Sequence, residues 1–126
     1  MAAMPEHTPP VNLDSALDSI DELWSPRVVA QLNAQHIRIA KIKGEFVWHE
    51  HEHEDEAFLV LRGSFRMDLQ DRSIELNKGD LFVVPRGTRH RPIADTECCI
   101  LLFEPAETIN TGNTQDPRTQ ARPKPL

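Results

Sequence analysis

The sequence predicts an all-β fold, an antiparallel barrel or jelly roll of about eight strands, and three observations support it. Short apolar runs follow one another along the middle of the chain. Polar and apolar side chains alternate most clearly in residues 64–70, so one face of that strand is predicted to be core and the other wet. Turn residues separate the runs, namely Gly63, Gly79, Gly87 and Pro85.

One short helix is expected before the strands. It spans residues 14–23, because Leu13, Leu17, Ile20 and Leu23 recur at helical spacing, and Asn12 or Asp14 is the expected N-cap. Beyond Pro26 the pattern becomes strand-like. Strands are expected over residues 28–32, 37–43, 45–51, 57–61, 65–69, 73–76, 81–84, 90–93 and 98–103.

The two ends of the chain are expected to be flexible. Six of the ten prolines lie there amid polar residues, which cannot bury enough area to offset the entropy of ordering. The sequence therefore predicts an N-terminal tail at residues 1–10, one folded domain at 11–110 and a C-terminal tail at 111–126.

The run from Trp48 to Glu56 places histidines and a carboxylate at metal-ligand spacing. In a strand, His49 and His51 would point to the same face and could bind one ion, while Trp48 would face away. Glu56 lies five residues beyond His51, so a turn or bulge must separate them. Residues 52–55 are acidic and suit a solvated loop, so His53 is interpreted as a loop residue and not as a ligand. An exposed charged turn is the alternative for the whole run.

A second motif occupies residues 79–90 and ends in His90. Neutral imidazoles and an ionised carboxylate suit a divalent first-row transition metal. Protons compete with a metal for histidine, so affinity is expected to fall as the pH drops through about 6 to 5.

Together the two motifs resemble those of the cupin superfamily. The first is usually written as glycine, five residues, His-x-His, three or four residues, Glu, six residues, glycine. This chain supplies Gly44, His49, His51, Glu56 and Gly63, with four residues instead of five after Gly44. In the second motif Gly79, Pro85, Gly87 and His90 match, and the frequent final asparagine is Ala94. The resemblance covers roughly residues 35–105.

This resemblance implies a cupin-type double-stranded β-helix in which His49, His51, Glu56 and His90 bind a divalent metal. Iron, manganese, nickel and zinc all remain open as its identity. A six-coordinate ion would keep two positions for water, substrate or dioxygen. A tetrahedral zinc held by all four groups would be structural.

Three functional classes follow for such a domain. The first is a metal-dependent enzyme acting on a small oxygenated molecule, with oxygenase-, isomerase- or lyase-like chemistry. Some small cupins of this kind resemble proteins loosely labelled mannose-6-phosphate isomerases, although only Arg86 and Arg89 could receive a phosphate here. The second class is a non-catalytic module that binds a metal or metabolite. The third is a structural dimer braced by its metal.

Composition limits the partners and the setting of the chain. A net charge of -6 argues against nucleic acid and against an anionic membrane surface. No apolar run suggests a signal peptide or a membrane span, so a cytoplasmic location is expected. Cys98 and Cys99 are adjacent in an apolar strand and are interpreted as reduced core residues on opposite faces. A homodimer is expected, because residues 28–32 would otherwise form an exposed edge.

Overall fold

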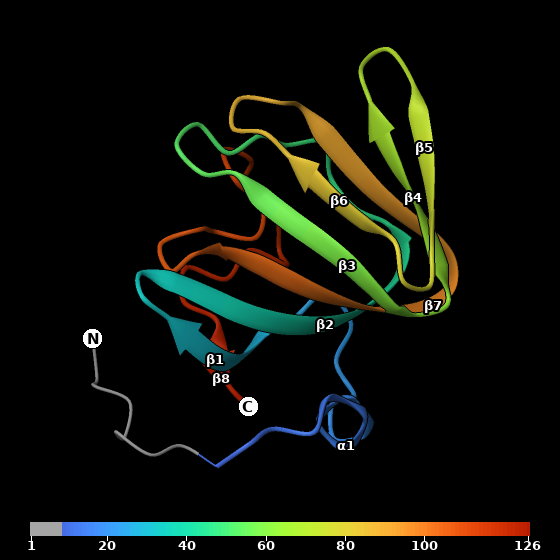
Figure 1. The fold of residues 1–126 in the computed structure, drawn as a ribbon. Coiled ribbons are helices and arrows are strands. Elements are labelled where there is room, and N and C mark those ends of the chain that lie inside the picture. Colours follow the sequence, from blue (N-terminus) through green and yellow to red (C-terminus); the bar gives the residue numbers. More distant parts are fainter. Residues whose placement is uncertain (1–8) are drawn as a thin grey trace.

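The computed structural model describes residues 9–126 of the chain. These residues contain eight strands and one short helix, joined by loops (Figure 1). Their order is α1 (Leu13–Asp18), β1 (Arg27–Leu32), β2 (Gln35–Glu45), β3 (Glu56–Arg62), β4 (Ser64–Leu69), β5 (Ser73–Asn77), β6 (Leu81–Val84), β7 (His90–Pro105) and β8 (Lys124–Pro125). Most of the predicted N-terminal tail, residues 1–8, lies outside the described residues.

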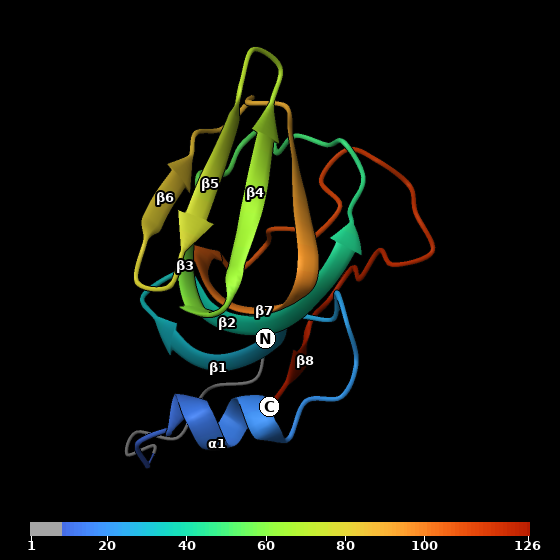
Figure 2. The same cartoon turned by 90° about the vertical axis from the view of Figure 1, so that its right-hand side faces the viewer.

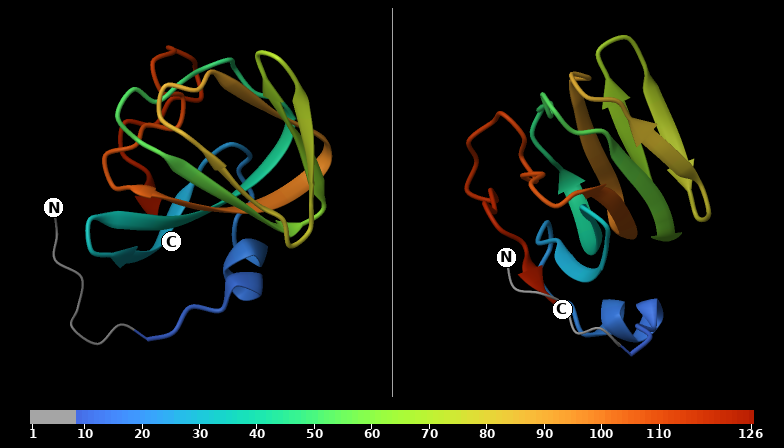
Figure 3. Two further views of the ribbon diagram at one scale, coloured as in Figure 1. Left: turned by 45° about the horizontal axis from the view of Figure 1, so that its top comes forward. Right: turned by 60° about the vertical axis from the view of Figure 1, so that its left-hand side comes forward.

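The long strand β7 organises the sheet. It pairs antiparallel with β2 from Gln35↔Pro105 to Glu45↔Ile93. Its C-terminal half also pairs with β3, and its N-terminal half with β4. The hairpin of β4 and β5 and the pair of β3 and β6 complete the wall of the barrel. The left view of Figure 3 shows the strands curving around a common interior. The predicted all-β double-stranded β-helix is confirmed.

Two apolar clusters stabilise this arrangement. The larger one fills the barrel and includes Ile42, Phe58, Phe65 and Met67. The smaller one lies outside it, where α1 packs beneath β1 and β2 (Figure 2). Cys98 belongs to the inner cluster and Cys99 to the outer one, and neither forms a disulfide. Their predicted placement on opposite faces of one strand is confirmed, and burial raises the pKa of Cys98 to about 12.

Helix α1 is shorter than predicted. Asn12 is the N-cap, as expected, and its side chain accepts a hydrogen bond from the Ser15 backbone N–H. The helix ends at Asp18, because the backbone N–H and the hydroxyl of Ser19 both turn back to Ala16 O. Residues 19–23 therefore leave the helical path, and Leu23 forms an isolated bridge to Lys41 instead. Apolar spacing alone did not reveal this stop.

Two strand predictions were wrong in the same region. Residues 45–51 do not form a strand: β2 runs through Gly44, at φ +86°, and ends at Glu45, and a loop follows. The strands expected at 90–93 and 98–103 are one continuous strand, β7. A register shift between Ile42 and Gly44 absorbs the extra residues of β7 between Ala94 and Cys98. The polar residues there bend the strand without ending it.

The C-terminal segment lies against the barrel. Residues 106–123, here called the C-terminal strap, run from the end of β7 past the loop after β2 and down to β8 (Figure 2). Strand β8 then pairs in parallel with β1 at Arg27 and Val28. The sequence predicts a tail from residue 111, yet Thr111 has an exposed fraction of 0%. The flexibility of this segment in solution stays a prediction.

Among residues 9–126, no helix is long and apolar enough to cross a membrane, since the single helix there has six residues.

Candidate metal centre

Four side chains that sequence analysis selected as ligands come together at one end of the barrel. His49 and His51 lie in the loop after β2, which is here called the ligand loop (residues 46–55). Glu56 is the first residue of β3, and His90 is the first residue of β7. This loop is the turn or bulge that the sequence predicted between His51 and Glu56.

Backbone hydrogen bonds join the two motifs. The N–H of His49 donates to His90 O at 3.0 Å, and the N–H of His90 donates to His49 O at 2.9 Å. This isolated antiparallel bridge sets the two imidazoles side by side, with ring centroids 4.2 Å apart. The N–H of Gly87, in the turn before β7, donates to His51 O at 2.8 Å. The second motif therefore positions both histidines of the first.

All four side chains are buried, with exposed fractions of 4% or less. One potential ligand atom from each lies within 4.8 Å of the others. His51 Nε2 is 3.3 Å and His90 Nε2 is 3.6 Å from Glu56 Oε1. Two ligand atoms on opposite sides of an ion, at bond lengths of about 2.1 Å, would be about 4 Å apart. The distances between these ligand atoms are thus close to those expected around one metal ion.

Two of the histidines have a fixed tautomer. His49 Nδ1 lies 2.9 Å from Val47 O, and His90 Nδ1 lies 2.9 Å from Thr88 O. A carbonyl can only accept, so each Nδ1 carries the proton and donates it. Each Nε2 then keeps its lone pair for another partner. Metal-bound histidines are usually oriented by such a hydrogen bond from the second ring nitrogen.

Several polar atoms of the cluster have no hydrogen-bond partner. They are both ring nitrogens of His51, Nε2 of His90 and Oε1 of Glu56. Burying a polar atom without a partner costs about 1–3 kcal/mol, so four of them in one place call for a missing group. Lone pairs from imidazole and carboxylate are what a divalent transition metal accepts. The residues present fit a metal ion.

Electrostatics separate the roles of the histidines. Burial, together with neighbouring His90, lowers the pKa of His49 to about 3. Burial also opposes a charge on His51, but the Glu56 carboxylate outweighs it and raises the pKa of His51 above 6.5. The pKa of Glu56 stays well below its usual range despite burial, because Glu104, His51 and His90 favour the carboxylate form. His49 is neutral and can bind a metal at neutral pH, whereas at His51 a proton competes with the metal for the imidazole.

Sequence analysis missed a buried ion pair beside the cluster. Arg38 Nη1 lies 2.7 Å from Glu104 Oε2, and both side chains are 1% exposed. Burial, then the Glu56 carboxylate, raises the pKa of Glu104 well above its usual range. The available signal was one carboxylate at the end of the apolar run 98–103. The side chain of Arg38 points into the barrel, while that of its neighbour Ile39 points out toward α1.

A small cavity reaches the cluster from inside the barrel. Glu56, His49 and Glu104 contribute its polar wall, and Trp24, Phe46 and Phe58 contribute to its apolar wall. It has about 40 Å³ of room for the centres of water-sized groups, enough for a few of them. The metal-ligand cluster therefore adjoins a space that can receive a small molecule or part of one.

Other residues considered in the sequence lie outside the cluster. The side chain of His53 is 78% exposed, as expected of a loop residue. Arg86 pairs with Asp55 on the surface, at 3.2 Å. The guanidinium of Arg89 lies over the ring of Trp48, whose centroid is 5.9 Å away. Neither arginine lines the cavity beside the metal ligands.

Comparisons with known proteins identify the family of the chain. A sequence model of the cupin domain matches residues 36–103. The uncharacterized protein YdbB of Bacillus subtilis is 32% identical over 101 residues, covering 78% of this chain and 89% of YdbB. A cupin-2 domain protein from Shewanella frigidimarina is 39% identical, with a TM-score of 0.74 over 75% of this chain and 93% of that one. Protein NMB1881 from Neisseria meningitidis is 28% identical, with a TM-score of 0.72 over 77% and 99%. The chain belongs to the cupin domain family.

Proposed function

We propose that the protein is a metal-dependent enzyme acting on a small oxygenated molecule, with His49, His51, Glu56 and His90 as the metal ligands. The observation that carries this proposal is the convergence of one ligand atom from each of these four buried residues within 4.8 Å, where three of the residues carry atoms without a hydrogen-bond partner. A divalent ion would bind one ring nitrogen of each histidine and the Glu56 carboxylate together.

A bound ion would supply Lewis acidity toward a carbonyl or hydroxyl oxygen, or a place for dioxygen. The protein's own residues hold the site for that chemistry. The hydrogen bonds from His49 and His90 to Val47 O and Thr88 O fix the direction of two imidazoles. The Glu56 carboxylate contributes a negative charge that partly offsets the charge of the ion.

Substrate size and polarity follow from the cavity. Its apolar residues Trp24, Phe46 and Phe58 exclude water, and only a small ligand or the end of a larger one fits the room available. Glu104 accepts a hydrogen bond from Arg38 through Oε2 and shares a hydrogen bond with Glu56, and its carboxyl group forms part of the cavity wall, where a ligand hydroxyl could contact it. A small molecule with adjacent oxygens could contact the ion and Glu104 together.

Two alternatives use the same residues differently. A non-catalytic module would bind a metal or metabolite without turnover. A structural centre would have its ion enclosed by protein ligands. The cavity beside His49 and Glu56 favours an ion with an open position and hence the first two classes.

The decisive experiment starts with protein purified without added metal. We expect about one divalent ion per chain by elemental analysis, after loading if necessary, and a water on Mn(II) that exchanges with solvent by relaxation measurements. Turnover of a panel of small hydroxy, keto and enediol compounds would then separate an enzyme from a binding module. An ion with no exchangeable water would instead support the structural class.

A homodimer is part of the proposal. The sequence placed the interface at residues 28–32, but β8 covers one end of this edge, at Arg27 and Val28. A better surface is β6, which pairs only with β3 among the described residues. Its outward Leu81 and Val83 are 67% and 50% exposed. An open antiparallel edge can pair with its own copy about a twofold axis.

Replacement of Leu81 and Val83 by Lys should therefore convert the dimer to a monomer in sedimentation at micromolar concentration. A native protein that is already monomeric would contradict this part of the proposal. The buried, unbridged Cys98 and Cys99 support a reducing, cytoplasmic setting, which also stays a proposal.

A further inference from the structure

The barrel holds the ligand loop through backbone hydrogen bonds at Phe46, His49 and His51, but not at Glu50. The loop belongs to no named strand, and its sheet-like contact is the bridge between His49 and His90. Glu50 lies between His49 and His51, so the position of its backbone determines how far apart these two imidazoles stand. What holds the backbone of Glu50 therefore affects the shape of the proposed metal centre.

The C-terminal strap forms hydrogen bonds with both backbone polar groups of Glu50, its N–H and its C=O. The N–H of Glu50 donates to Asn113 Oδ1 at 3.1 Å. The N–H of Asn113 donates to Glu50 O at 3.1 Å. One residue on, the hydroxyl of Thr114 donates to Trp48 O at 2.9 Å. These hydrogen bonds lie on either side of His49.

Gly112 lets the strap approach this closely. A Cβ at this position would lie 2.2 Å from Glu50 O and 3.2 Å from His49 Cδ2, and the residue has φ +54°. A side chain would thus collide with the backbone of the ligand loop. Only glycine allows this contact.

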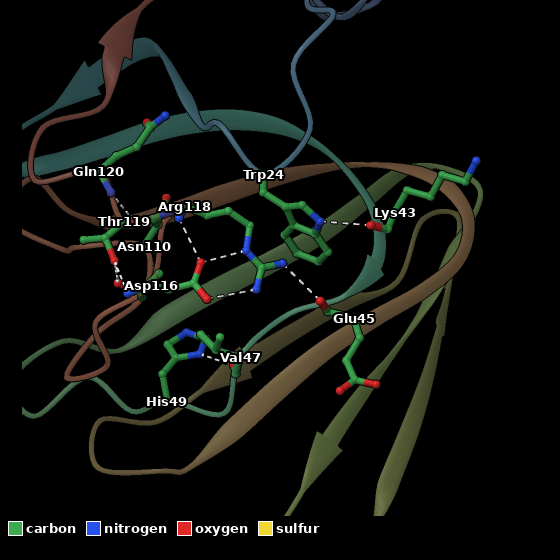
Figure 4. A network of polar contacts seen from close by, with 11 residues as sticks. Trp24, Lys43, Glu45, Val47, His49, Asn110, Asp116, Arg118, Thr119 and Gln120 are labelled. Atoms are coloured by element: carbon green, nitrogen blue, oxygen red, sulfur yellow. Dashed lines mark hydrogen bonds and ion pairs between the residues drawn. The ribbon is translucent and has the colours of Figure 1, made fainter.

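The strap is itself anchored at both ends. Near its start, Arg38 donates to Ala106 O and Thr108 O at 2.8 Å each. Near its end, Gln120 Nε2 donates to Ser25 Oγ at 2.7 Å. Between them, the guanidinium of Arg118 lies over the Phe46 ring, 4.6 Å from its centroid. Figure 4 shows Arg118 between Trp24 and the part of the loop that carries Val47 and His49.

We propose that Asn113 and Gly112 are positioning residues of the metal centre, through which the C-terminal strap sets the separation of His49 and His51. This inference rests on the proposed metal function. A loop fixed before binding loses less conformational entropy when it coordinates an ion, so the strap raises metal affinity without touching the ion. The strap lies outside the matched cupin region, which ends at residue 103.

The test compares Asn113→Ala with Thr119→Val, using the metal-free protein reloaded with Co(II). Thr119 Oγ1 bonds Thr111 Oγ1 and the Asp116 N–H, both within the strap, so Thr119→Val perturbs the strap without removing a contact to the ligand loop. We expect Asn113→Ala to weaken Co(II) binding about tenfold in competition titrations, as for other outer partners of metal ligands. Thr119→Val should leave affinity within about twofold of the native protein.

Two further variants make the result specific. Asn113→Asp keeps an oxygen that accepts from Glu50 and should restore most of the affinity. Gly112→Ala should alter the visible Co(II) spectrum, because the loop must move to admit the Cβ. Equal losses in Asn113→Ala and Thr119→Val, or no loss in Asn113→Ala, would overturn the positioning role while leaving the metal centre intact. A native protein that binds no Co(II) would overturn the proposed function, and this inference with it.

Discussion

Two buried polar clusters in the same barrel differ in how well their atoms are satisfied. Around Asp68, both carboxylate oxygens are bonded: Oδ1 accepts from Arg66 and Ser73, and Oδ2 accepts from Arg91, whose Nε is the one buried atom of this cluster without a partner. Around Glu56, one carboxylate oxygen and three imidazole nitrogens have no hydrogen-bond partner. A cluster that stabilises a fold satisfies its own groups, whereas a binding site keeps groups free for a ligand. Substitutions should therefore affect stability at the first cluster and metal binding at the second.

The largest effect is expected from His51→Ala. Removal of a ligand should weaken metal binding more than about 100-fold, beyond the range for outer partners, and His49→Ala and His90→Ala should behave alike. Titration with Co(II) or Zn(II) after removal of metal measures the loss. His53→Ala is the matched control in the same loop and should bind normally, since its side chain is exposed. Equal losses from all four changes would mean that the ligand loop is misassigned.

Glu56→Gln should have the next largest effect. The substitution keeps the shape of the side chain but removes the charge that opposes the charge of the ion, so affinity should fall about tenfold or more. The protein should remain folded, since the substitution keeps the backbone pairing of Glu56 with Val84 and changes only a side chain whose partners are Glu104, His51 and His90. Circular dichroism and the same titration together check this. Full metal occupancy in a folded Glu56→Gln protein would remove Glu56 from the site.

Metal affinity should depend on pH in part through His51. An imidazole must be neutral to bind an ion, and the pKa of His51 in the metal-free protein is raised above 6.5 by Glu56. Below that pKa a proton must leave for each ion bound, so affinity should fall about tenfold per pH unit. The pKa of His49 is about 3, so His49 adds nothing to this slope above pH 4.

The decline is therefore expected to begin at a higher pH than the range of 6 to 5 that the ligand set alone predicts. Calorimetric titrations between pH 5 and 8, in buffers of different ionisation enthalpy, would count the protons released. A curve with its midpoint near pH 4 and strong sensitivity to salt would instead indicate loose binding to the acidic residues 52–55.

Asp68→Asn is expected to give the smallest change, and in stability alone. The Ser73 hydroxyl, followed by the two arginines, lowers the pKa of Asp68 to about 2. Its contribution is therefore present above the usual pKa of 3.8 and is lost as the pH falls toward 2. At pH 7 the variant should be less stable by about 1 kcal/mol, allowing for solvent screening, with metal affinity unchanged.

Urea unfolding at several pH values tests this prediction. The difference between native protein and Asp68→Asn should shrink to zero between pH 4 and 2. A loss of metal affinity in this variant would show that the two clusters are coupled and would contradict a purely stabilising role of Asp68.

The sequence predicted most of the strands and the opposite faces of Cys98 and Cys99 through local rules, because a strand alternates with period two. The four side chains that converge were predicted by the resemblance of the two motifs, read along the chain, to those of cupins. The sequence also predicted His53 to be a loop residue and not a ligand, since the three acidic residues among positions 52–55 mark a solvated loop.

Only the tertiary structure decided which strand face points inward and what surrounds the site. Alternation cannot tell that Arg38 enters the barrel while Ile39 packs under α1, because both faces of β2 are buried. The pair of Arg38 and Glu104 joins residues 66 positions apart, and the bond from Asn113 to Glu50 spans 63. Contacts over such distances depend on how β2 and β7 pair and on where the chain runs after β7, which no local pattern records.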